Sequence, residues 1–136
     1  MPYAGVLRGR GALVAGPRLG IVGSRKADAY GVEIAQRVAT AAANRGVSVV
    51  SGGAFGIDIA AHRAALAADG RTVVVLGSGL SHPSPRTHLA VFEAAVDRGT
   101  VVSCFPCHRH AAQWTFLRRN EWVAALSTAL VVVQAG

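Results

Sequence analysis

Residues 47–58 read Val47-Ser48-Val49-Val50-Ser51-Gly52-Gly53-Ala54-Phe55-Gly56-Ile57-Asp58 and set out the plan of the chain. The stretch begins with the apolar pattern of a β-strand, breaks into small residues, and continues into a helical pattern that ends near Ala68. A helix that starts directly after a strand presents unpaired backbone N–H groups and the positive end of its dipole at one point. Such a point attracts phosphate, so the stretch predicts an anion-binding turn at the end of a buried strand.

The same order of strand, small-residue turn and helix recurs on both sides of this stretch. Before it, an apolar run at residues 19–22 leads into Gly23-Ser24-Arg25 and then into a helical pattern over residues 30–45. After it, the predicted elements are a strand at residues 72–76, the turn Gly77-Ser78-Gly79, a helix at 88–98, a strand at 100–103, a helix at 116–126 and a strand at 129–133.

This order of elements predicts the fold class. Strands of Val, Ile and Leu without polar alternation are buried on both faces, and helices between them connect parallel neighbours. The sequence therefore predicts an α/β fold: a doubly wound, mainly parallel sheet with helices on both faces, of Rossmann-like type. The 136 residues fit a single domain. Residues 1–18 are expected to form an irregular lead-in, with a short edge strand at residues 5–8 and a helical turn at residues 11–15.

The charge balance favours a polyanionic partner. The chain carries 14 basic residues, all but one of them arginines, against 7 acidic residues, for a formal net charge of +7. The planar guanidinium groups of arginine match the geometry of phosphate oxygens. The electric field of a small domain with this net charge also steers polyanions toward it. Solvated surface arginines without a binding role are the alternative. The two cysteines and the lack of a signal peptide or a long apolar run predict a cytoplasmic protein without a membrane partner.

The candidate binding residues lie at the predicted carboxyl ends of the strands, where ligands of such sheets bind. A second cluster, Arg118-Arg119-Asn120, follows Trp114 and Phe116 and is placed at the start of the last helix. There the dipole disfavours cations, which indicates function for the arginines, whereas packing is expected of the aromatics. The residues predicted to contact phosphate, sugar or base are Gly23, Ser24, Arg25, Lys26, Ser51, Gly52, Gly53, Phe55, Gly56, Gly77, Ser78, Gly79, Arg118, Arg119 and Asn120.

Other chemistry-bearing residues are interpreted as structural. Asp58 and His62 stand one helical turn apart, yet no nucleophile accompanies them, so no catalytic residue is predicted. Residues 104–110 hold two cysteines and two histidines, but so many ligands on so short a loop rarely close one tetrahedron around zinc. Neither a metal nor another cofactor is predicted.

Taken together, these residues resemble the DNA-processing protein A family, also called DprA or Smf. The family's order and spacing are matched by Ile21-Val22-Gly23-Ser24-Arg25, Tyr30-Gly31, Ser51-Gly52, Gly56-Ile57-Asp58, Ala61-His62, residues 75–80, Phe116, Arg118-Arg119-Asn120 and Leu126-Ser127. The resemblance implies a Rossmann-like core that binds single-stranded DNA, protects incoming strands in natural transformation and helps to load the RecA recombinase. It also implies self-association as a homodimer and no catalysis.

The sequence departs from this family pattern at identifiable positions. The family usually has Arg where this chain has Phe55 and Glu where it has Cys104, and its pattern continues beyond Gly136. Two other functions fit the same fold. A nucleotide hydrolase of the phosphoribohydrolase type requires a Pro-Gly-Gly-x-Gly-Thr-x-x-Glu turn, which this sequence lacks. A nucleotide-binding domain without DNA binding is the other alternative, and Phe55 in place of arginine favours it.

Overall fold

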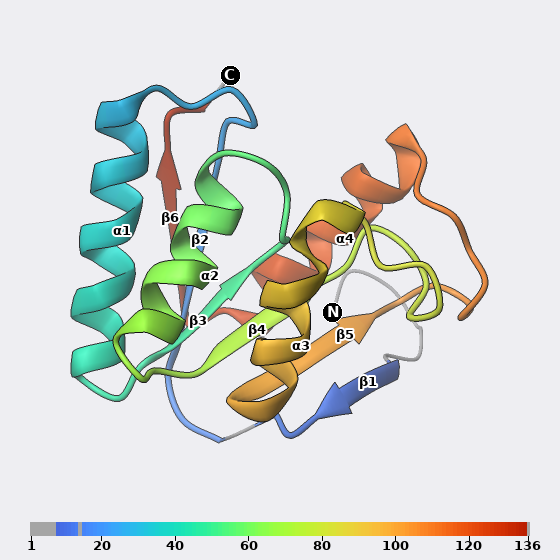
Figure 1. Cartoon of the computed structure of the whole chain (residues 1–136), viewed down its shortest axis with the longest axis horizontal. Helices are drawn as coiled ribbons and strands as arrows, with labels where there is room; N and C mark the ends of the chain where they lie inside the picture. The colour runs from blue at the N-terminus through green and yellow to red at the C-terminus, as the bar shows by residue number, and fades with distance from the viewer. Residues whose placement is uncertain (1–7, 14, 136) are drawn as a thin grey trace.

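The computed structural model of the chain describes residues 8–13 and 15–135, and within them six strands form one sheet (Figure 1). The strands are β1 (Arg8–Gly11), β2 (Arg18–Gly23), β3 (Ser48–Ser51), β4 (Thr72–Val75), β5 (Gly99–Ser103) and β6 (Ala129–Val133). The helices are α1 (Ala29–Asn44), α2 (Ile57–Ala67), the short 3-10 helix η1 (Arg86–His88), α3 (Leu89–Asp97) and α4 (Gln113–Leu126). The strand order is β1-β5-β4-β3-β2-β6, and every pair is parallel except β1 with β5.

Successive strand residues face opposite layers of helix. Val49 of β3 joins the core cluster that contains α1 and α2, whereas its neighbour Val50 packs with Trp122 and Val123 of α4. Helix α3 covers the same face as α1 and α2, and α4 lies behind the sheet (Figure 1). The strands are therefore apolar on both sides, as the sequence pattern requires. The predicted doubly wound, mainly parallel α/β sheet is confirmed.

The direction of winding reverses at β2. From β2 the chain passes through α1 to β3 and onward to β4 and β5, always across the face that α1, α2 and α3 cover. It then returns through α4, on the opposite face, to place β6 on the free side of β2. Parallel sheets bind ligands in the crevice outside the carboxyl ends of the strands at such a reversal. The fold therefore places the functional site near the end of β2.

The amino-terminal elements differ from the sequence prediction. A strand was expected at residues 5–8, but β1 covers Arg8–Gly11, and residues 1–7 lie outside the described part of the chain. The helical turn expected at residues 11–15 is wrong for the residues that are described, because Gly11 ends β1 and the Ala12 N–H donates to the Gly99 carbonyl over 2.9 Å. Pairing with β5 thus holds this segment in an extended conformation.

The last helix begins earlier than predicted. It starts at Gln113 rather than near Phe116, because the Thr115 hydroxyl accepts a hydrogen bond from the Ala112 N–H over 2.9 Å and donates to the Ala112 carbonyl over 2.7 Å. Arg118 and Arg119 therefore lie in the second turn of α4 and not at its start. The argument that the helix dipole disfavours these cations is accordingly wrong.

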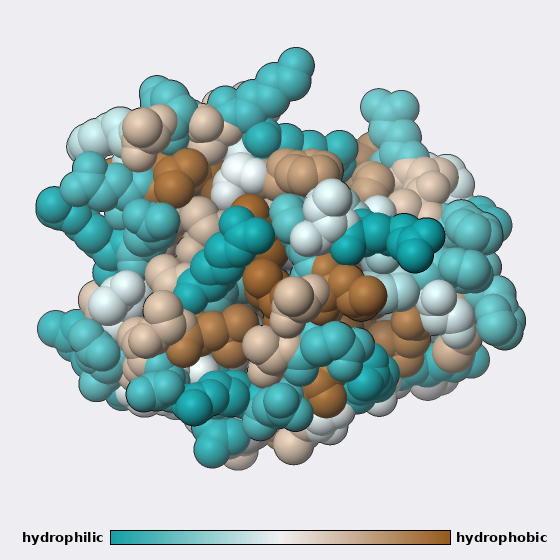
Figure 2. Space-filling view, in the orientation of Figure 1, coloured by the Kyte–Doolittle hydropathy of each residue, from teal (hydrophilic) through white to brown (hydrophobic). Residues whose placement is uncertain are grey.

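The face formed by α1, α2 and α3 is mixed in polarity. Hydrophobic residues appear there as separate small patches between hydrophilic ones (Figure 2). Exposed ion pairs contribute to this polar cover, as between Arg37 and Glu33 at 2.9 Å on α1. Within the described residues, no helix combines the length and the apolarity that crossing a membrane requires.

Candidate nucleic-acid interface

The backbone N–H groups of the turn after β3 are already bonded within the protein. The Asp58 carboxylate accepts hydrogen bonds from the N–H of Gly52 over 3.1 Å and from that of Ala54 over 3.4 Å, and the His62 Nε2 accepts from Gly53 over 3.1 Å. Burial raises the pKa of Asp58, and the Arg119 guanidinium partly offsets this effect. The protein's own carboxylate thus occupies the position in which the sequence suggested a phosphate, and it holds the turn closed.

His62 continues the same buried network. Its Nε2 accepts from the backbone, so the proton belongs on Nδ1, which donates to the Thr72 hydroxyl over 2.7 Å. That hydroxyl donates in turn to the Val49 carbonyl over 3.0 Å. Complete burial, followed by the charges of Arg119 and His88, lowers the pKa of His62 to about 3. His62 is therefore a neutral connector between α2 and two strands, which agrees with its structural interpretation.

Arg119 fastens α4 to the ends of the strands. Its side chain is only 3% exposed, and Nη1 donates to the carbonyl of Gly52 and, over 2.9 Å, to that of Val75. Its Nε donates to the Asn120 side-chain oxygen over 3.1 Å. Burial lowers the pKa of Arg119, and the nearby Asp58 carboxylate opposes that shift. The guanidinium is committed to strand-end carbonyls, so Arg119 supports the surface.

The predicted glycine turns are packing sites. A Cβ at Gly52 would meet the Arg119 guanidinium, one at Gly77 the Phe116 ring, and one at Gly53 the Phe92 ring. Gly56 has a positive φ of 78° and lies against the Ser24 carbonyl, which accepts from the Ile57 N–H over 3.2 Å. Neighbouring protein atoms therefore fill the space that the sequence suggested for a ligand's phosphate.

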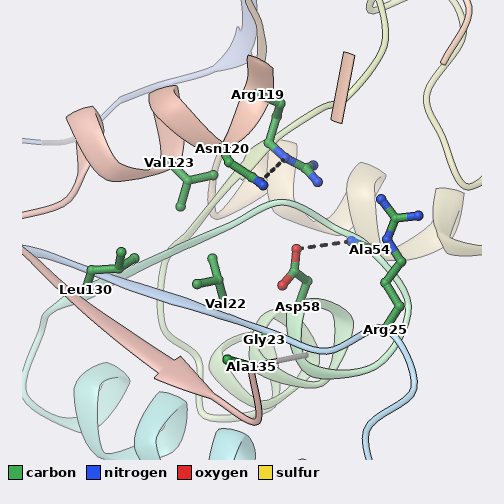
Figure 3. A pocket seen from close by; sticks show the side chains of 10 residues that line it. All are labelled: Val22, Gly23, Arg25, Ala54, Asp58, Arg119, Asn120, Val123, Leu130 and Ala135. Carbon is green, nitrogen blue, oxygen red and sulfur yellow. Dashed lines mark hydrogen bonds between the residues drawn. The ribbon is translucent and has the colours of Figure 1, made fainter. Parts of the chain in front are cut away.

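A pocket of about 280 Å³ opens beside these turns, where the winding reverses (Figure 3). Arg25 enters it from the loop after β2 and Asn120 from α4, while Val22 and Leu130 of the sheet supply apolar floor. The loop that carries Arg25 is anchored to the end of β6, because the Ser24 N–H donates to the Gln134 carbonyl over 2.9 Å. The pocket thus combines exposed donors with an apolar base.

Aromatic side chains flank the basic residues at this edge. The Arg25 guanidinium lies 4.6 Å from the centroid of the half-buried Phe116 ring, and Arg109 lies equally far from the Trp114 ring. Phe55 is 51% exposed and packs edge-on against His88, with ring centroids 4.8 Å apart. Charge beside flat apolar surface is what flexible polynucleotides require of a binding protein. The family model for DNA recombination-mediator protein A matches residues 1–136. The chain belongs to this family.

Family membership confirms the resemblance found in the sequence, and individual relatives support it. The chain is 47% identical over 116 residues to the putative DNA processing protein DprA of Mycobacterium tuberculosis, covering 85% of this chain and 30% of the relative. It is 38% identical over 119 residues to protein Smf of Escherichia coli, covering 87% of this chain and 32% of that protein. The chain spans about 30% of the length of such curated relatives.

Solved structures of the same family share the fold closely. DNA processing protein A from Helicobacter pylori, whose structure is described for its single-stranded DNA binding mode, aligns with a TM-score of 0.86 at 28% identity over 95% of this chain and 60% of that one. The Streptococcus pneumoniae protein aligns with a TM-score of 0.86 at 29% identity over 95% of this chain and 46% of that one. A molybdenum cofactor binding protein from Rippkaea orientalis aligns with a TM-score of 0.64 at 20% identity over 88% of this chain and 63% of that one, which shows a shared fold alone.

The predicted binding residues of this family member fall into three groups by exposure. Those on the surface are Arg25, Lys26, Phe55, Arg118 and Asn120. Those partly exposed are Gly23, Ser24 and Gly56, and those buried are Ser51, Gly52, Gly53, Gly77, Ser78, Gly79 and Arg119. The fold gathers all three groups at the carboxyl edge, but only the first two are open to a ligand.

Sequence reasoning assigned the aromatics of α4 to packing, and this holds only in part. Trp122 is buried at 2% exposure, whereas Trp114 is 49% exposed and carries Arg109 over its ring. Neither Trp114 nor Arg109 was among the predicted binding residues. The sequence feature that could have indicated them is the basic, His-rich loop that precedes Trp114.

Proposed function

We propose that this chain is a single-stranded DNA-binding module whose contact surface is the carboxyl edge of the sheet between the loop after β2 and helix α4. The observation that carries the proposal is the stack of Arg25 on Phe116 beside the pocket at the winding reversal. A guanidinium held over the half-buried Phe116 ring offers a phosphate contact, and the exposed Phe55 ring at the same edge offers a surface for a base.

The comparisons support this proposal through the family. The Helicobacter pylori protein is described as binding single-stranded DNA, and its structure overlaps this chain with a TM-score of 0.86 over 95% of the residues. The surface cations Arg25, Lys26 and Arg118 lie at the carboxyl edge of the sheet, where parallel α/β sheets bind ligands. Shared fold, shared family and a basic aromatic surface therefore support one function.

Each exposed residue has a proposed role. Arg25, Lys26 and Arg118 contact phosphates, Phe55 stacks on a base, and Asn120 bonds a sugar or a base edge, while the half-buried Phe116 ring holds Arg25 in place. The buried turns and Arg119 hold these side chains in place without touching the strand. Phe55 replaces a charge of the family pattern with stacking surface.

Further roles of the longer proteins belong to the same proposal. We assign to this family member the protection of incoming strands in the cytoplasm, the loading of RecA recombinase and homodimer formation, as the family resemblance implies. Co-sedimentation of RecA with the DNA-bound protein tests the loading role. The molar mass in solution from light scattering tests homodimer formation. Binding of DNA without any effect on RecA filament formation would reject the loading role.

Fluorescence anisotropy tests the central proposal. A labelled oligothymidylate of about 20 nucleotides is titrated with protein at several salt concentrations, and the same experiment is repeated with duplex DNA. Neutralising about three phosphates gives a slope of about −2 in log K against log salt for single strands. Absence of binding at low salt, or a preference for duplex, would reject the proposal.

A further inference from the structure

The loops after β4 and β5 enclose a second pocket, of about 610 Å³, at the β1 side of the carboxyl edge. Backbone hydrogen bonds join the two loops: the Gly79 N–H donates to the Arg109 carbonyl over 2.8 Å, and the Ser81 N–H donates to the Cys107 carbonyl over 2.9 Å. Since the first pocket lies beside β2 and β6, the two pockets occupy opposite ends of one edge.

Two imidazoles line this second pocket, and a third lies next to them. The His82 and His110 rings stack with centroids 3.9 Å apart and an interplanar angle of 28°, and the His108 centroid lies 6.1 Å from that of His82. Arg86 also lines the pocket, and no carboxylate is among its described lining residues. The pocket therefore concentrates groups that are cationic or become cationic on protonation.

The stacking argues against a metal as the occupant. The lone pair of an imidazole nitrogen lies in the plane of its ring, so two stacked rings do not direct their nitrogens at a common point between them. Among the residues that the structure describes, no group of three or more His, Cys, Asp or Glu side chains is placed to hold a metal ion. An anion suits the pocket better because it gains from each added positive charge.

The charged neighbours of His82 oppose its protonation. Partial burial lowers the pKa of His82, and His110, His108 and Arg86 lower it further in that order. His108 and His110 act from the loop after β5 and Arg86 from η1, while α3 contributes only the apolar Leu89 to the pocket. An arriving anion would favour protonation of His82, because it supplies the negative charge that these neighbours lack.

We infer that this pocket binds a phosphate group of a bound DNA strand together with a proton, forming a second backbone contact that strengthens as the pH falls. The inference rests on the proposed function, because the strand must first be held at the Arg25 end of the edge. One imidazole of the His82–His110 pair takes this proton from solvent, and the resulting imidazolium donates a charge-assisted hydrogen bond to a phosphate oxygen.

Binding measured at two pH values tests this inference. The affinity for the labelled oligothymidylate is compared at about pH 7.5 and about pH 6, at constant ionic strength, for the wild type, for His82→Gln/His110→Gln, and for Arg45→Gln as a control. Arg45 follows α1 near the amino edge of the sheet and lies away from both pockets. We expect the wild type and the control to bind about fivefold more tightly at the lower pH and the double variant to change less than about twofold.

The outcomes separate the two proposals. An equal pH response in the double variant overturns the inference and leaves the first site intact, whereas a wild type that does not bind at pH 7.5 rejects the proposed function and the inference with it. Proton NMR of the imidazoles gives an independent readout: the His82 pKa rises on adding the oligonucleotide. An equal rise with the same concentration of inorganic phosphate would overturn the assignment to the strand.

Discussion

The Arg25 guanidinium lies 4.6 Å from the centroid of the Phe116 ring and so connects the loop after β2 to helix α4. Phe116 rests on Gly77, where a Cβ would collide with the ring. Segments far apart in the sequence thereby meet in one stack at the carboxyl edge. Cation–π contact holds the guanidinium in place while its outer edge stays open to solvent.

Arg25→Ala is expected to weaken binding of single-stranded DNA about tenfold and to reduce the salt slope by about 1, because one phosphate contact and part of the stack are lost. Arg37→Ala is the matched control. It removes the same charge from the exposed surface of α1, where Arg37 pairs with Glu33, and should leave the affinity within about twofold. Equal losses in both variants would mean that net charge, not the stack, drives binding.

Gly77→Ala is expected to displace the Phe116 ring and to reduce both DNA affinity and stability, the latter by about 1–3 kcal/mol. Phe116→Leu in the same background makes room for the new methyl group. That double variant should recover stability in urea unfolding but not affinity. Wild-type binding by Gly77→Ala would remove Phe116 from the interface.

Arg119→Ala is expected to destabilise the fold by about 3–5 kcal/mol, because Asp58 loses its buried countercharge and the Gly52 and Val75 carbonyls lose their donor. Arg118→Ala, on the exposed side of α4, should cost about 1 kcal/mol or less while weakening DNA binding. Urea unfolding monitored by tryptophan fluorescence measures both. An Arg119→Ala protein of wild-type stability that fails only in binding would make Arg119 a direct DNA contact.

Phe55 tests how this chain departs from the family pattern. Phe55→Ala should weaken binding by about 1–3 kcal/mol through lost stacking. Phe55→Arg should bind about as tightly as the wild type, with a salt slope steeper by about 1, because a phosphate contact replaces the stacking. Anisotropy titrations at several salt concentrations measure both effects. If neither substitution changes binding, the exposed ring at position 55 lies outside the interface.

Acid should destabilise the chain through His62. The folded-state pKa of His62, about 3, lies below the usual 6.5, so below pH 6.5 the folded state binds fewer protons than the unfolded state. The stabilisation present above pH 6.5 is therefore lost as the pH falls toward 3. The slope is at most about 1.4 kcal/mol per pH unit for this group. His62→Gln keeps an acceptor for the Gly53 N–H and should flatten the slope between about pH 6.5 and 5 in urea unfolding. An unchanged slope would show that other groups control acid unfolding.

The sequence predicted the sheet because its strands carry a local signal. The runs that became β3 and β4 lie within one residue of the expected positions, since burial on both faces favours Val-rich segments without charged residues. The edge strand β1 carries no such signal, because its sequence is Arg-Gly-Arg-Gly and its order comes from pairing with β5.

The site was predicted less completely, for geometric reasons. Adjacent helical residues point about 100° apart, so only one of Arg118 and Arg119 can face the sheet, and the predicted start of α4 did not reveal which one. The turn after β3 was placed correctly, but its occupant is Asp58 of the same chain. The approach of His82 to His110 joins loops after different strands, which no local pattern encodes.

Chemical-shift mapping by NMR tests the proposed interface most directly. Unlabelled oligothymidylate is added to ¹⁵N-labelled protein at neutral pH and low salt, and each backbone amide reports on its own surroundings. The account predicts that the largest shifts occur at Arg25, Phe55, Phe116 and Asn120, with α1 unchanged. Shifts concentrated on α1 and α2, or none at Arg25 and Phe116 when the strand is bound, would contradict it.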